Sequence, residues 1–157
     1  MNEEMILTPI FNQLNIAIQS LIHMSEQFTE EELSITPIMN KRSVLDVFSH
    51  IAVICRADHL ISCEATMDEM SEFYKHNEPI TLSDIRRHLG ENFQYLYEVY
   101  AEYTHKELFE IKTSYWGVSY SRYEWLLEIV AHVFHHRGQL HSMLTHNVRD
   151  PKVPLFE

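Results

Sequence analysis

The residues best suited to chemistry lie in one short run, His132-Val133-Phe134-His135-His136-Arg137-Gly138-Gln139. His132 and His136 are four residues apart, in a segment whose apolar residues recur at helical spacing. On an α-helix, this separation places two side chains about 40° apart around the axis and about 6 Å apart along it. Both imidazoles can then reach one divalent ion at about 2.0–2.1 Å. The simpler alternative is a chance spacing, because the chain has 11 histidines.

A third histidine, His50, is expected on the buried face of an earlier helix, three residues after Val47 and four before Ile54. The pair in the later segment shares its stripe with large apolar residues, namely Trp125, Ile129, Leu140 and Met143. Buried imidazoles without a partner are costly, and a shared metal ion would satisfy them. Alone, His50 would be a hydrogen-bonded core histidine. Together, we predict His50, His132 and His136 as the ligands of one divalent metal ion.

Three histidine ligands leave coordination positions for water or substrate, which is typical of a catalytic rather than a structural site. A bound metal can deprotonate water or a thiol near neutral pH. The spacing also matches the zincin motif, but Val133 stands where that motif has its glutamate base, which rules out a zincin protease. Asp46 and Glu128 each precede a proposed ligand by four residues and could orient it. The alternative for both carboxylates is a position in the first turn of a helix or an exposed helix position.

Six other histidines have no partner at ligand spacing. We expect each of them to be solvated or singly hydrogen-bonded: His23, His59, His76, His88, His105 and His146. His135 could lie just outside the metal ligands or at a helix interface, and His141 is not expected to share a metal with His136. Tyr115, Trp116 and Tyr120 could line a substrate entrance or pack the last loop.

Four segments with apolar residues at helical spacing must position these groups: residues 5–27, residues 43 to between 63 and 73, residues from about 81 through 100, and residues 121–147. Three of them open on a capping pattern, at Ser43, Thr81 and Ser121. No segment shows sustained strand alternation, and residues 109–120 are expected to be irregular. We predict an all-α four-helix bundle that forms one domain over residues 1–157. The long connections leave an up-down-up-down order open.

Composition excludes several classes of partner. The formal net charge is −11, from 12 basic and 23 acidic residues, which disfavours nucleic acids and anionic membranes. No run of apolar residues approaches the length of a membrane span, and the acidic start Met1-Asn2-Glu3-Glu4 is unlike a secretory leader. Cys55 and Cys63 are too far apart on one helix to pair, so we expect reduced thiols and a cytoplasmic protein.

The last-helix run and the segment Ser43-Val44-Leu45-Asp46-Val47-Phe48-Ser49-His50-Ile51 resemble the DinB/YfiT-like superfamily of metal-binding four-helix bundles. The resemblance covers roughly residues 5 to 147, and Arg42 stands where many relatives carry an aromatic residue. It implies a site for zinc, nickel or a similar ion at His50, His132 and His136, and a homodimer. Relatives include transferases and isomerases that use bacillithiol, mycothiol or glutathione.

These observations favour a metal-dependent transferase that joins a low-molecular-weight thiol of the bacillithiol type to small electrophiles. Two alternatives stay open: a metal-dependent hydrolase with Glu128 as the candidate base, and a non-catalytic metal-binding stress protein. No catalytic residue is assigned beyond the metal ligands. In the last helix, Gly138 is expected to permit close helix approach, Gln139 to bond near the site, and Arg137 to pair with an acidic residue.

Overall fold

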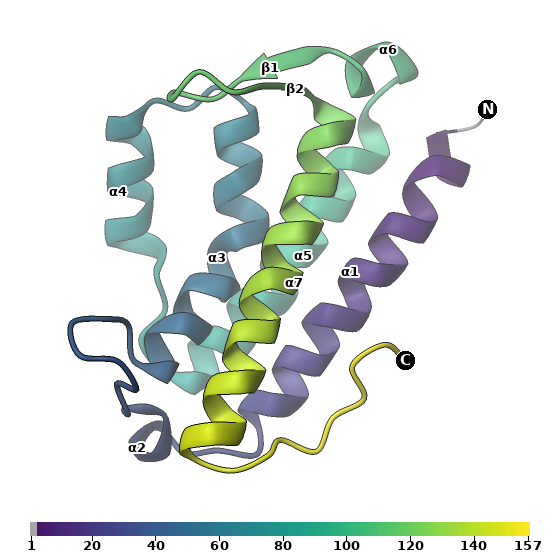
Figure 1. Ribbon diagram of the computed structural model, residues 1–157. Helices are drawn as coiled ribbons and strands as arrows, with labels where there is room; N and C mark the ends of the chain where they lie inside the picture. Colours follow the sequence, from purple (N-terminus) through teal and green to yellow (C-terminus); the bar gives the residue numbers. More distant parts are fainter. Residues whose placement is uncertain (1–2) are drawn as a thin grey trace.

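The computed structural model describes residues 3–157, with side chains described from Met5 onwards, so Met1 and Asn2 of the acidic start lie outside the described residues. Four long helices form a bundle, which confirms the predicted fold class (Figure 1). Their bounds are α1 Glu3–Ser25, α3 Val44–Ser62, α5 Leu82–Glu102 and α7 Arg122–Asn147.

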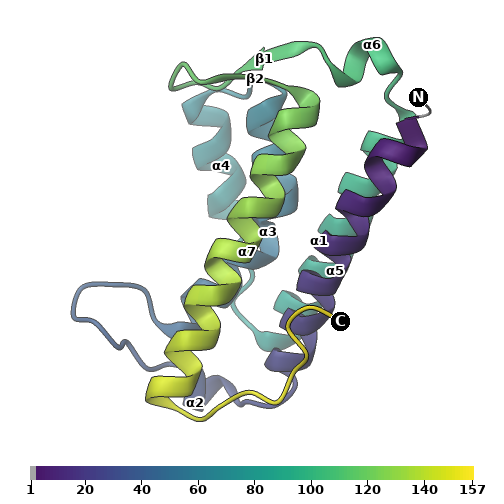
Figure 2. The same cartoon turned by 45° about the vertical axis from the view of Figure 1, so that its right-hand side comes forward.

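The four long helices are not arranged in simple chain order around the bundle. α1 and α3 each pack against both α5 and α7, so the first two long helices lie diagonally opposite each other. α1 and α7 run in one direction while α3 and α5 run in the other (Figures 1 and 2). The cause is α4, Met67–Asn77, which returns the chain along α3 before α5 begins. This arrangement places α3 directly beside α7, as the predicted metal site requires.

The helix starts follow the predicted capping patterns. Ser43 forms a complete capping box with Asp46: the Asp46 amide donates to Ser43 Oγ at 3.1 Å, and the Ser43 amide donates to Asp46 Oδ2 at 2.9 Å. Thr81 and Ser121 cap α5 and α7 by accepting from the amide three residues later. Such caps satisfy amides that have no partner inside the helix. Because the Asp46 carboxylate is engaged at the start of α3, the prediction that it could orient His50 is wrong.

Several short elements were not expected from the sequence: α2 Glu30–Leu33, α6 His105–Leu108, the helix α4, and an antiparallel hairpin of β1 Ile111–Thr113 and β2 Ser119–Ser121. The three helices do carry a signal, because each follows a threonine with a glutamate three residues later, at Thr29, Thr66 and Thr104. The hairpin strands are too short for alternation to be recognised. Its turn holds Gly117 at φ 90°, a conformation that favours glycine.

The hairpin is attached to the start of α7. The indole nitrogen of Trp125 donates to the Lys112 carbonyl at 3.1 Å, and Tyr120 packs on the Trp125 ring with 5.0 Å between ring centroids. Tyr120 is therefore a packing residue. The hairpin closes one end of the bundle (Figure 1). The centroid of its exposed Trp116 ring lies 6.4 Å from that of the Trp125 ring of α7, and the exposed Tyr115 ring packs on Trp116.

Residues Met5–Ser25 of α1 are long and apolar enough to cross a membrane by length and composition, a property that core helices of bundles share. In the bundle, α1 buries a continuous stripe that includes Leu14, Ile18 and Leu21. Its other face carries exposed polar side chains such as Gln13 and Gln19. The helix therefore packs here as an amphipathic core element.

Candidate metal centre

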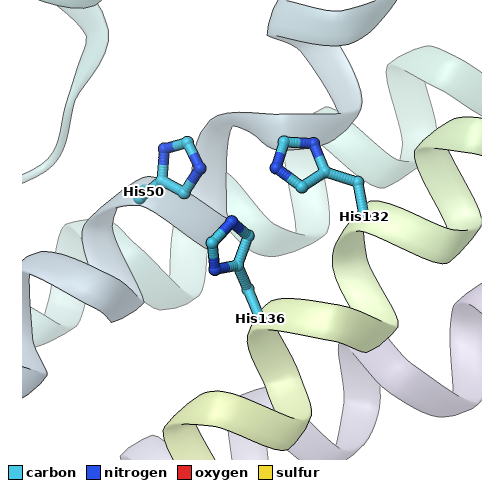
Figure 3. Close-up of side chains that lie close together, drawn as sticks. All are labelled: His50, His132 and His136. Atoms are coloured by element: carbon cyan, nitrogen blue, oxygen red, sulfur yellow. The ribbon is translucent and has the colours of Figure 1, made fainter.

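The three predicted ligands come together between α3 and α7. His50 projects from α3, and His132 and His136 project from successive turns of α7, with the three rings facing one another (Figure 3). Ring centroids are 5.5 Å apart for His50 and His132, 4.8 Å for His50 and His136, and 4.9 Å for the α7 pair. One nitrogen from each ring lies within 4.8 Å of the other two, and all three side chains are half-buried. We call this set the three-histidine cluster.

Two rings of the cluster are held by hydrogen bonds on their outer side. His132 Nδ1 donates to Asp58 Oδ2 at 2.6 Å, and His136 Nδ1 donates to Gln139 Oε1 at 2.8 Å. A donor at Nδ1 leaves Nε2 with a free lone pair, which is the form that binds a metal. The prediction that Gln139 bonds near the site is confirmed. His50 differs, because its Nδ1 is buried and has no hydrogen-bond partner within residues 3–157.

Electrostatics keep two of the three rings neutral. Burial lowers the pKa of His50 to about 3, with a further contribution from the positive charge of Arg42. Burial also lowers the pKa of His136. In contrast, the hydrogen bond to Asp58 raises the pKa of His132 above its ordinary value. Metal binding requires the neutral form of each imidazole, and three imidazoles around one point could hold a divalent metal ion.

Asp58 is the functional residue that the sequence reasoning missed. It lies on α3, is only 6% exposed, and contacts a histidine 74 positions later in the chain. The available signal was a carboxylate on the apolar stripe of α3, between Ile54 and Ile61, where a charge needs a partner. Glu128, the residue expected to orient His132, shows no hydrogen bond to that ring within residues 3–157.

Glu128 nevertheless lies close to the site. Its carboxylate, the Asp58 carboxylate and a His132 nitrogen lie within 4.8 Å of one another, which makes a second group that could hold a cation. Burial raises the pKa of Glu128 to about 6, and the charge of Asp58 adds to this effect. Because His132 Nδ1 is bonded to Asp58, this group surrounds the outer side of the ring, opposite the three-histidine cluster.

Two cavities are each lined by one histidine of the three-histidine cluster. One, of about 280 Å³, is reached past His132; its lining residues are Asp58, Ile61, Tyr74, Tyr115, Trp116, Trp125, Glu128 and His132. The other, of about 550 Å³, is reached past His136; its lining residues are Pro37, Ile38, Lys41, Arg42, Val47, His136, Gln139, Ser142 and Met143. We call them the aromatic cavity and the basic cavity. Tyr115 and Trp116 thus line a cavity beside the site.

Other predictions for α7 need correction. Arg137 is 4% exposed and donates to Ser20 Oγ on α1 at 3.1 Å, so its predicted pairing with an acidic residue is wrong. Its guanidinium also lies over the rings of Phe134 and Phe156. No described atom outside the local helix lies within 4 Å of the position that a Cβ on Gly138 would take, so the predicted close helix approach there is absent.

His59 was expected to be solvated or singly bonded, and this is wrong. The ring is 5% exposed, with Tyr95 Oη at 2.9 Å from Nδ1 and Tyr103 Oη at 3.2 Å from Nε2. Burial lowers its pKa to about 4. His59 therefore belongs to a polar network between α3 and α5, away from the three-histidine cluster.

Comparison with known proteins places this arrangement in a family. No curated protein matches the chain. A solved DinB-like protein from Bacillus cereus ATCC 10987 shares the fold, with a TM-score of 0.73 and 18% identity over 92% of this chain and 95% of that one. A solved DinB family member from Exiguobacterium sibiricum 255-15 is more similar, with a TM-score of 0.85 and 32% identity over 96% of this chain and 97% of that one. Since the DinB family profile also matches residues 7–147, the chain belongs to the DinB family.

Proposed function

We propose that the protein is a metal-dependent transferase that joins a low-molecular-weight thiol of the bacillithiol type to small electrophiles. The three-histidine cluster would hold the metal, with zinc and nickel as the leading candidates. We further propose that it acts as a homodimer in the cytoplasm, which light scattering of the purified protein and cell fractionation would test.

The observation that carries this proposal is that two different cavities each have a histidine of the cluster in their walls. A transferase must bring two substrates to one reacting atom; His132 lines the aromatic cavity and His136 lines the basic cavity. Their volumes, about 280 Å³ and about 550 Å³, suit small molecules. A structural metal site would need no such access.

When bound, the metal supplies acidity, because coordination deprotonates a thiol near neutral pH. The chain contributes the rest. Asp58 and Gln139 keep protons on the outer nitrogens of His132 and His136, so that the inner nitrogens stay available. The thiolate sulfur then attacks an electrophilic carbon; a C–S bond forms, and a C–O bond of an epoxide or a C–Cl bond breaks. The thiol proton passes to the alkoxide or to solvent.

One observation favours a second candidate, a hydrolase at the same site. Glu128 lines the aromatic cavity beside His132, and its pKa is raised to about 6, which suits a general base near neutral pH. In that reaction Glu128 would accept a proton from the attacking water. The third alternative, metal binding without turnover, requires only the three-histidine cluster.

Metal content and activity separate these functions. We would purify untagged wild-type protein together with His50→Ala, His132→Ala and His136→Ala, and measure bound metal. His146→Ala is the matched control, since His146 lies on α7 but is exposed and bonded only to nearby residues of its own helix. We expect the three cluster variants to lose metal and the control to retain it. Equal metal in all five proteins would show that the cluster is not the site.

Activity is then measured with metal-loaded protein on epoxides and chlorinated electrophiles, with and without bacillithiol or glutathione. Thiol-dependent product formation that disappears in His136→Ala supports the transferase. Thiol-independent hydrolysis that disappears in Glu128→Gln would establish the hydrolase instead. If metal binds and neither reaction occurs across a broad panel, the non-catalytic alternative is favoured.

A further inference from the structure

The basic cavity has an unusual distribution of charge for this chain. Its wall combines the loop before α3 with α7, and it contains two cations, Lys41 and Arg42, with no acidic residue in its lining. The whole chain carries a formal net charge of −11, so most of its surface is acidic. A cavity that is lined by two cations and no acidic residue is therefore an exception on this protein. The aromatic cavity on the other side of the cluster instead contains the carboxylates of Asp58 and Glu128.

Lys41 and Arg42 are exposed, and among the side chains that the structure describes, from Met5 to Glu157, no carboxylate lies within 4.0 Å of either charged group. Other cations on this surface are neutralised locally, as Arg87 is by Asp84 at 2.8 Å and Arg149 is by Glu32. Lys106 offers a direct contrast, because the cavity that it lines also contains Glu107 and Glu110. The two cations of the basic cavity are therefore available to a ligand.

Arg42 also lies within electrostatic range of the proposed metal site. Arg42 and the cluster histidine His136 line the same cavity, so the guanidinium lies beside the cluster. A cation so close to three metal ligands opposes the binding of a divalent ion through repulsion. The presence of the cation becomes favourable when a ligand places an anionic group beside it. A guanidinium suits this role, because its planar set of N–H donors matches a carboxylate or a phosphate.

We infer that the basic cavity binds a carboxylate or phosphate group of the substrate, held by Arg42 and Lys41, while the reacting end of the same molecule reaches the three-histidine cluster past His136. The inference rests on the proposed function, and it specifies that the thiol cosubstrate is an anionic thiol. Ile38, Val47 and Met143 line the same cavity, so the carbon chain of the substrate would pack against them.

The test uses cobalt(II)-loaded protein and two thiols that differ in charge, neutral 2-mercaptoethanol and dianionic mercaptosuccinate. Thiolate binding to cobalt is followed by its charge-transfer absorption. We expect wild-type protein to bind mercaptosuccinate at least about tenfold more tightly than 2-mercaptoethanol, because hydrogen bonds between charged groups are stronger than those between neutral groups. Arg42→Gln should reduce that ratio about tenfold, and Lys41→Gln should reduce it less, because a lysine binds as a point charge without a fork.

Lys106→Gln is the matched control, since it removes one exposed cation from a different cavity and should leave the ratio unchanged. Using the ratio of two thiols in each variant cancels any change in metal affinity. Equal affinity for both thiols in wild-type protein, or an unchanged ratio in Arg42→Gln, would overturn the inference.

The proposed function can fail separately. If cobalt binds and neither thiol produces a charge-transfer band, thiol use is wrong, and the anion site is then judged by calorimetric titration with succinate. Saturable succinate binding that is lost in Arg42→Gln would still support an anion site beside the cluster. No succinate binding to the wild-type protein would overturn it.

Discussion

The hydrogen bond between His132 and Asp58 makes a quantitative prediction for metal affinity. Asp58→Asn preserves the size of the side chain but removes the charged acceptor at 2.6 Å from His132 Nδ1. Without the carboxylate, the imidazole is a weaker donor to the metal, and the ring is free to adopt the tautomer with its proton on Nε2. Loss of such a partner typically lowers metal affinity about 10- to 100-fold, or about 1.4 to 2.8 kcal/mol.

The pH of the measurement decides whether this loss is visible. Asp58 raises the pKa of His132, so near neutral pH a proton competes with the metal for the ring, and removing the carboxylate relieves that competition. This effect opposes the loss of affinity. Well above the ordinary histidine pKa of 6.5, at about pH 8.5, the competition is small and only the weaker donor remains. The affinity loss should therefore be larger at pH 8.5 than at pH 6.5.

The assay is competition with a chromophoric chelator for zinc, at both pH values, with circular dichroism to confirm folding. Glu128→Gln is the control, since it removes a negative charge from the same cavity without a hydrogen bond to His132. We expect a smaller change in affinity for this control. If Asp58→Asn binds zinc as tightly as the wild-type protein at pH 8.5, the orienting role assigned to Asp58 is refuted.

Three further predictions concern stability and substrate access. Without metal, His59 should contribute a loss of up to about 3 kcal/mol in the free energy of unfolding as pH drops from 6.5 to 4, because the unfolded chain binds a proton there that the buried ring, with its pKa near 4, binds poorly. His50, with its pKa near 3, adds a further loss, so the measurement is a comparison: His59→Gln should lose less stability than the wild-type protein in denaturation at several pH values, and an equal loss would contradict this. Ser43→Ala should destabilise the fold by about 1 kcal/mol through loss of the α3 capping box, whereas the same change at Ser71, exposed inside α4, should have a smaller effect in urea denaturation. Trp116→Ala should leave metal content unchanged but raise the KM for the electrophile, since the ring lines the aromatic cavity and contacts no cluster histidine; unchanged kinetics would place the electrophile elsewhere.

The sequence by itself determined the features that depend on neighbours along the chain. The four long helices follow from apolar spacing, and their starts follow from capping residues that act within three positions, as at Ser43. The pairing of His132 with His136 is likewise local, because four residues make about one helical turn. His50 could be added because a histidine on a buried stripe needs a partner, and the structure brings it to the pair.

Only the tertiary structure decided which groups from distant segments meet. Asp58 contacts His132 across 74 positions, and a long sequence separation carries no pattern that periodicity can detect. Asp46 was chosen for its spacing from His50, but its own helix start had a stronger local use for the carboxylate. The diagonal placement of α1 and α3 depends on how α4 redirects the chain. The aromatic cavity takes Tyr74 from α4 and Trp116 from the hairpin, whereas the basic cavity takes Lys41 and Arg42 from the loop before α3. Residue types along the chain determine where helices form and how they are capped. Side-chain packing between helices determines which polar groups become hydrogen-bond partners and which cavities give access to the cluster.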